Sequence, residues 1–271
     1  MTQSFCPSIR NKKTSLVLLG CLCFVLGCSG MKAKPADTSP FLEYPDLLKP
    51  WYDRAPWDAV WSAQPGKIMV QQSEARTIYI APVNTHYLNL KKDKDGKEIK
   101  IYKLSSEDRH DMTNYLQQAF VEAIKNTPKT NLTLVSDPSD AQLILEIALV
   151  ELVPTSVGTN VFADVGALII PGANVAEEAA AAGGQAAGAA WAAGTIAMEF
   201  KIIDRATRTV IAEAKDRESD PASIIPNYRD FEEFGWSRQT AQNWAEQFAE
   251  IFSSPASKKI ELASEISYTP W

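Results

Sequence analysis

Four cysteines are the side chains of this sequence whose type and placement most suggest covalent chemistry. Cys6, Cys21, Cys23 and Cys28 all lie in the first 28 of its 271 residues, and none follows. Cys28 directly follows the uncharged run "TSLVLLGCLCFVLG", which extends from Thr14 to Gly27. Because the thiolate is nucleophilic enough for ready alkylation, Cys28 is the residue at which we expect a modification.

Other reactive groups form no recognisable site. The two histidines, His86 and His110, lie outside any H-E-x-x-H or Cys/His pattern, and the sequence has no G-x-S-x-G, Walker or dinucleotide motif. Asp93 and Asp95 lie among lysines that would repel a cation, and no Glu completes a calcium loop. We therefore predict no catalytic residue, no metal and no cofactor, and a protein that is not an enzyme.

The elements around Cys28 are typical of an export signal. Residues 1–13 carry Arg10, Lys12 and Lys13 without an acidic side chain, and the apolar run follows directly. That run has about 14 residues, whereas a bilayer-spanning helix needs about 20. Residues 1–27 are thus predicted to be a signal peptide and not a permanent transmembrane helix.

The end of this run, "VLGC", resembles the lipobox of bacterial lipoproteins. The resemblance implies cleavage by signal peptidase II between Gly27 and Cys28, and a lipid anchor on Cys28 made of an S-diacylglycerol and an N-linked palmitate. Ser29 follows where an Asp would imply retention at the inner membrane. The resemblance therefore implies a lipoprotein attached to the periplasmic side of the cell outer membrane.

The net charge and the distribution of cysteines fit a periplasmic location. Without residues 1–27 the chain has 24 basic and 33 acidic side chains, a formal net charge of −9, and no cysteine other than Cys28. The absence of further thiols suits an oxidising compartment. The negative charge argues against nucleic acid and against electrostatic docking on anionic lipid, so the membrane contact is expected through acyl chains.

Residues 28–40 are small, polar and Pro-containing, and are predicted to be a tether. Residues 41–61 form an aromatic arm in which three prolines prevent a long helix. One interpretation is an extended arm strapped across the domain, with its rings in surface grooves. The other is a partner-binding stripe, whose candidate contacts are Trp51, Trp57 and Trp61.

The rest predicts a single α+β domain over 41–252. Strand patterns cover 76–83, 131–137, 141–153, 195–204 and 209–219, and a hairpin is expected around Asp95-Gly96. Amphipathic helices are expected from Ser105 or Ser106 to Thr127 and again before Pro255. We expect a mostly antiparallel sheet with both long helices packed on one face, preceded by the lipid-anchored extended arm.

Two further segments are irregular. An Ala/Gly-rich insertion spans 163–194, and its residues 176–194 include 11 alanines and 4 glycines. It is interpreted as a small-residue helix or loop at a protomer contact, or alternatively as a membrane-inserting hairpin, which Glu177 and Glu178 would oppose. Residues 253–271 are predicted to be a C-terminal tail.

The order of motifs resembles the bacterial lipoprotein family of the domain of unknown function 3313. The resemblance covers roughly residues 38–252 and rests on the lipobox, "FLEYPDLLKP", "IYIAPV", "LSSEDRHDMTNYLQQAFVEAI", "AMEFKIIDRATRTVIAE" and "NWAEQF". The turn "ATR" departs from the expected "xTG". The family implies no activity that could be carried over.

We therefore expect a non-enzymatic binding or envelope-assembly module with a protein partner or a homo-oligomeric state. The alternatives are a subunit of an oligomeric envelope channel or secretion apparatus, in which 163–194 makes the contact, and, more weakly, a hydrolase of envelope material.

Overall fold

Buried hydrophobic residues from both the strands and the helices form the main core of this chain. The computed structural model describes residues 35–51, 54–63, 76–92, 98–100, 103–154, 194–219, 234–255 and 257–260. The elements in chain order are η1 (Pro45–Leu47), β1 (Ala59–Ser62), β2 (Arg76–Ile80), β3 (Leu90–Lys92), β4 (Glu98–Lys100), α2 (Ser106–Asn126), β5 (Leu132–Leu134), β6 (Leu143–Val153), β7 (Thr195–Asp204), β8 (Thr209–Ser219) and α6 (Gly235–Ser253).

The sheet is mixed and mostly antiparallel, which confirms the predicted α+β class. Its strand order is β1-β8-β7-β6-β2-β5, and only the pairs β6–β2 and β2–β5 are parallel. The predicted hairpin is present as the separate pair β3–β4. Strand β1 was not predicted: the second half of the aromatic arm joins the sheet beside β8.

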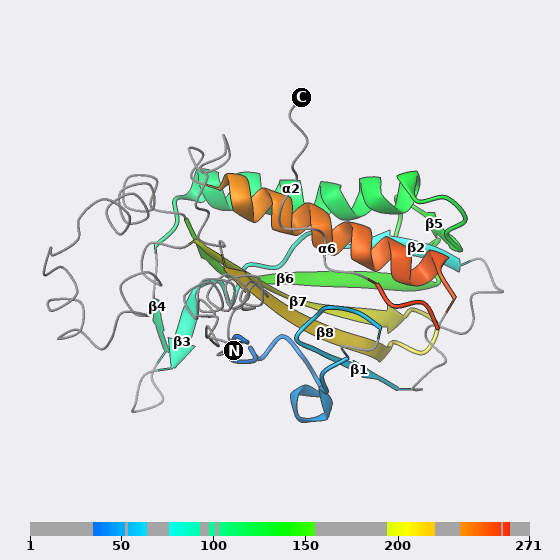
Figure 1. The fold of residues 1–271 in the computed structure, drawn as a ribbon, viewed down its shortest axis with the longest axis horizontal. Helices are drawn as coiled ribbons and strands as arrows, with labels where there is room; N and C mark the ends of the chain where they lie inside the picture. Colours follow the sequence, from blue (N-terminus) through cyan, green and yellow to red (C-terminus); the bar gives the residue numbers. More distant parts are fainter. Residues whose placement is uncertain are drawn as a thin grey trace, which may run out of the picture. The chain divides into compact units, whose positions relative to one another are not determined.

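Both predicted helices are present and lie side by side on one face of the sheet (Figure 1). Ser105 caps α2, because its hydroxyl accepts a hydrogen bond of 3.0 Å from the amide of Asp108. Tyr115 of α2 is exposed, and its ring lies beside the guanidinium of Arg238 on α6. No helix within the described ranges has the length and hydropathy to cross a membrane.

The main core lies between the helices and the inner face of the sheet. Alternate residues of β6 and β7 point into it and are almost fully buried: Leu145, Ile147, Leu149, Met198, Phe200 and Ile202. Phe248 of α6 contacts both Phe120 of α2 and Phe200 of β7, at ring-centroid distances of 5.4 and 5.6 Å. Each such side chain contributes about 1.5–3 kcal/mol on burial, so this layer supplies most of the stability.

The segment that follows α6 differs from the predicted tail over 253–271. Among its described residues, Ile260 is 1% exposed and joins the main core. Arg54, which is 3% exposed, holds this segment. Its guanidinium donates to the carbonyls of Ile251 and Ser254, at 3.0 and 3.1 Å, and also to those of Pro255 and Lys258. Arg54 thereby satisfies carbonyls that the end of α6 leaves without helical partners.

Replacing Arg54 by Ala should lower the free energy of unfolding by about 2–4 kcal/mol, because several buried carbonyls lose their donor. Arg54→Lys should lie between the wild type and Arg54→Ala, since an ammonium cannot reach four acceptors with the geometry of a guanidinium. Urea unfolding measures both values. Lys125→Ala is the control: its ion pair with Glu122 is exposed, and its loss should cost less than about 0.5 kcal/mol. An Arg54→Ala effect as small as that of the control would contradict the capping role.

Candidate binding site

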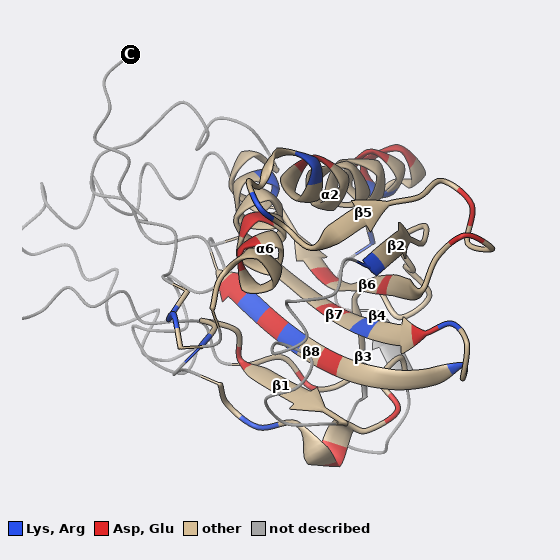
Figure 2. Cartoon of the chain, turned by 90° about the vertical axis from the view of Figure 1, so that its right-hand side faces the viewer, with Lys and Arg blue, Asp and Glu red and all other residues tan. Residues whose placement is uncertain are grey.

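The outer face of the sheet, opposite the helices, carries charges in an alternating pattern. Cross-strand pairing places Lys201 between Glu146 and Glu213, and pairs Glu199 with Lys215. Unlike charges therefore oppose each other on neighbouring strands, which stabilises the pairing. Figure 2 shows the charged residues following one another along β8.

This outer face is covered by residues 36–48, which we call the docked arm. The backbone amide of Ser39 donates to one oxygen of the Glu199 carboxylate at 2.8 Å, and its hydroxyl donates to the other. The backbone amides of Glu43 and Tyr44 donate to the two oxygens of Glu213, at 2.7 and 2.9 Å. Two successive amides on one carboxylate form a small anion-binding nest.

Cationic and apolar contacts complete the docking. The ammonium of Lys215 donates to the carbonyl of Ala36 at 2.9 Å and to the hydroxyl of Thr38 at 3.0 Å. Phe41 and Leu42 are buried in a second, smaller cluster with three small or medium residues of the sheet, Ala148, Val150 and Ala197. Residues 36–40, predicted to belong to a free tether, are thus bound to the domain.

Burial governs the protonation of Glu199, which is 1% exposed. Desolvation raises the pKa of Glu199 above its ordinary value, and this outweighs the hydrogen bonds from Ser39 and the charge of Lys215, which lower it. The neighbouring charge of Glu213 raises it further. Both carboxylates are occupied by the docked arm, so neither is placed as a free acid or base.

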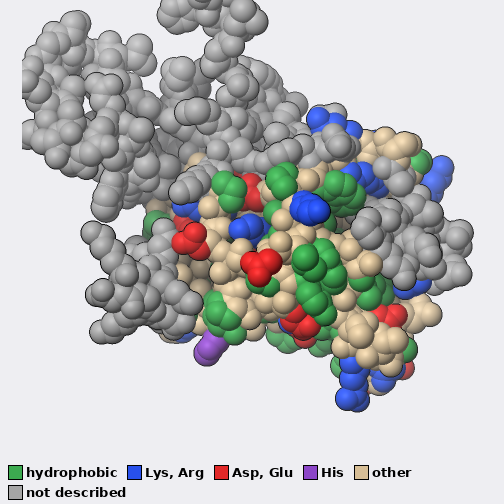
Figure 3. All heavy atoms as spheres, turned by 90° about the horizontal axis from the view of Figure 1, so that it is seen from below, with side chains coloured by type: hydrophobic (Ala, Val, Ile, Leu, Met, Phe, Trp, Pro, Cys, Tyr) green, Lys and Arg blue, Asp and Glu red, His purple; other side chains and the backbone are tan. Residues whose placement is uncertain are grey.

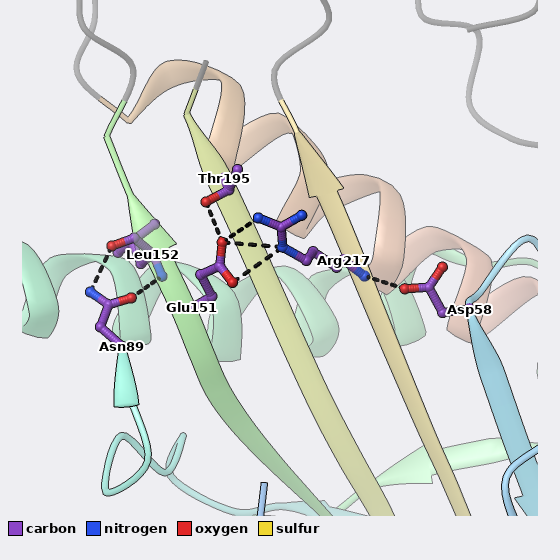
Figure 4. A network of polar contacts seen from close by, with 6 residues as sticks. All are labelled: Asp58, Asn89, Glu151, Leu152, Thr195 and Arg217. Atoms are coloured by element: carbon purple, nitrogen blue, oxygen red, sulfur yellow. Dashed lines mark hydrogen bonds and ion pairs between the residues drawn. The ribbon is translucent and has the colours of Figure 1, made fainter. Parts of the chain in front are cut away.

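A second polar network lies at the far end of β6, β7 and β8 (Figure 4). Glu151 accepts hydrogen bonds of 2.7 and 3.1 Å from the guanidinium of Arg217, and a further one from the hydroxyl of Thr195. The backbone amide of Arg217 donates to Asp58 at 3.1 Å, which links β8 to the start of β1. The network ties the strand ends together.

On the visible surface of this side of the molecule, acidic, basic and apolar side chains are interspersed (Figure 3). Within the described ranges no three His, Cys, Asp or Glu side chains gather as metal ligands would. The site is thus one for packing and hydrogen bonding, with no broad field of one sign.

The three tryptophans proposed as partner contacts converge on one cavity of about 360 Å³. It lies at the edge of the inner face, between β1, β8 and the last turns of α6. Trp57 is 2% exposed, and its indole N–H donates to Gln247 at 3.0 Å. A flat partner-binding stripe is therefore the wrong description for Trp57, whose ring packs in the core and forms a cavity wall. Trp51 and Trp61 are half-buried at its rim.

Sequence reasoning missed the residues that receive the docked arm, Glu199, Glu213 and Lys215. Their signal in the sequence is the charge placed at alternate positions of two adjacent strands. Gly27, Cys28, Ser29 and all but the last residue of the insertion 163–194 lie outside the described residues.

Glu199→Gln should remove a pH dependence of stability. In the unfolded chain the Glu199 carboxyl loses its proton near its ordinary pKa of 4.5, whereas in the folded protein it keeps the proton to a higher pH. The free energy of unfolding of the wild type therefore falls as pH rises from 4.5 through the raised pKa of the folded state. An uncharged Gln avoids this loss. The stability of Glu199→Gln relative to the wild type should therefore increase as pH rises above 4.5, as measured by urea unfolding at several pH values. Two parallel stability curves would refute this assignment; Glu146→Gln, whose side chain is 37% exposed, is the control.

Glu213→Gln should loosen the docked arm without unfolding the sheet. A Gln side chain offers one acceptor oxygen where the carboxylate has two, so Glu43 or Tyr44 loses its acceptor. Hydrogen exchange at these amides should quicken by at least about tenfold, the equivalent of about 1.4 kcal/mol. Exchange within β7 should stay as in the wild type. Unchanged exchange at residues 43 and 44 would count against the carboxylate clamp.

Comparison with known proteins places the chain in a family. Some solved structures are similar to it. The PelC dodecamer from Paraburkholderia phytofirmans has 8% sequence identity and a TM-score of 0.35, and the match covers 67% of this chain and 90% of that chain. Protein XCC0632 from Xanthomonas campestris, assigned to DUF330, has 11% identity and a TM-score of 0.34, with 66% of this chain and 86% of that chain covered. The hypothetical protein CT253 from Chlamydia trachomatis has 10% identity and a TM-score of 0.35, with 66% of this chain and 97% of that chain covered. No curated protein matches the sequence. The model of the family described as "Protein of unknown function (DUF3313)" matches residues 58–248, more than half of the sequence, and the chain belongs to this family.

Proposed function

We propose that this protein is a lipid-anchored lipoprotein on the periplasmic side of the outer membrane, and that it acts there as a non-enzymatic binding or assembly module. The observation that carries the proposal is the docked arm. The arm begins eight residues after Cys28, at Ala36, and from there the chain is bound to the sheet. A lipid anchor at Cys28 would therefore be separated from the docked arm by only a few residues.

Chain geometry limits the distance between anchor and domain. Eight extended residues span at most about 29 Å, so lipid on Cys28 would hold Ala36 within that distance of the bilayer surface. Two or more acyl chains give stable attachment, at about 0.8 kcal/mol for each buried methylene. This arrangement suits a protein that presents a surface close to the membrane.

The occupied carboxylates support binding over catalysis. Glu199 and Glu213 are the buried acidic pair of the outer face, and each is used to hold backbone amides of the arm. A general acid or base needs access to a substrate proton, which a side chain clamped in this way lacks. This supports the view that the sheet holds an element in place and does not turn over a substrate.

Cys28→Ala should abolish incorporation of labelled palmitate, because the sulfur that carries the lipid is gone. Radiolabelling of cells followed by immunoprecipitation measures the incorporation. Cys23→Ala is the matched control and should be labelled like the wild type. Palmitate labelling that persists in Cys28→Ala would overturn the lipoprotein proposal.

A further inference from the structure

The cavity at the edge of the inner face has an apolar interior and a polar rim. Its walls include six aromatic side chains: Trp51, Trp57, Trp61, Phe200, Phe248 and Phe252. Its volume of about 360 Å³ lies at the small end of the roughly 300–1,000 Å³ of small-molecule sites. It therefore has room for one apolar chain or ring system and is too small for a bulky two-chain lipid.

Three lining residues have polar side chains beyond an indole N–H, and only two can serve a ligand. Glu213 is a wall residue, but its carboxylate oxygens accept the amides of Glu43 and Tyr44. The hydroxyl of Ser62 is buried and has no hydrogen-bond partner among the described residues. A buried hydroxyl without a partner is costly, and it would gain an acceptor from a ligand once the Ser62 side chain turned toward the cavity.

Lys49 supplies a positive charge on the same side of the cavity. Its backbone pairs with Val60 of β1 through hydrogen bonds of 3.0 and 2.8 Å, and Ser62 lies two residues further along that strand. Val60 and Ser62 point to the same face, because side chains alternate along a strand. Lys49 is exposed and makes no ion pair within the described part of the chain. The polar end of the cavity thus combines an ammonium and a hydroxyl, while the rings of Trp57, Phe200 and Phe248 are buried.

We propose that this cavity binds the alkyl chain of a single-chain anionic amphiphile, a free fatty acid. The carboxylate would lie beside Lys49 and accept a hydrogen bond from Ser62, and the chain would extend along Trp57 toward Phe248. Lys49 provides a countercharge for an anion at the rim, and the apolar interior accommodates a hydrocarbon chain. The inference goes beyond the lipoprotein assignment and does not depend on lipid at Cys28.

Bromine quenches indole fluorescence at short range, and three of the seven tryptophans line this cavity. The purified full chain in amphipol is titrated with 9,10-dibromostearate. Saturable quenching at one equivalent is expected, with competition by unbrominated stearate. The methyl ester, which lacks the negative charge, should bind at least about tenfold more weakly, or about 1.4 kcal/mol. Quenching that never saturates, or equal binding of acid and ester, would overturn the proposal.

Two variants locate the ligand. Ser62→Leu narrows the cavity and removes the hydroxyl, so it should weaken saturable quenching. Lys49→Ala changes an exposed side chain that the fold does not need. This variant should bind the fatty acid as weakly as the wild type binds the methyl ester. Lys125→Ala, on the far helix α2, should bind like the wild type. Wild-type binding by Lys49→Ala, or by a Ser62→Leu protein that unfolds at the normal urea concentration, would place the fatty acid elsewhere and refute the site.

Discussion

Two buried carboxylates on the outer face of the sheet, Glu199 and Glu213, constrain the segment that covers them. They are 1% and 0% exposed, and buried negative charge is tolerated only with donors close by. The docked arm supplies these donors from its own backbone, at Ser39, Glu43 and Tyr44. The arm in turn excludes water from the carboxylates, so the cover and the charges it covers stabilise each other.

The two faces of the sheet are consequently covered by different means. On the inner face, helices α2 and α6 bury aliphatic and aromatic side chains, which gives a strong and nondirectional contribution. On the outer face, a short irregular segment is held mainly by hydrogen bonds to charged groups, which are directional and fix its register. The small side chains of Ala148 and Ala197 leave the space that Phe41 and Leu42 fill.

One stretch of chain connects the features to which we assign function. Residues 36–44 dock on the outer face, and residues 47–51 then turn the corner of the sheet and line the tryptophan cavity. Residues 59–62 then form β1, the edge strand that pairs with β8. The docked arm and one wall of the cavity are therefore close together in the sequence.

The sequence by itself determined the α+β class, both long helices and the inner, apolar face of β6 and β7, because these follow from hydrophobic periodicity within each element. It also identified three tryptophans that prove to share one cavity. It could not show that Glu199 is buried, since its cover comes from Ser39, 160 residues away along the chain. Nor could it show that Arg54 caps α6 or that Ile260 joins the core. Alternation along a strand separates two faces, but only tertiary packing decides whether water or another part of the chain covers the polar one.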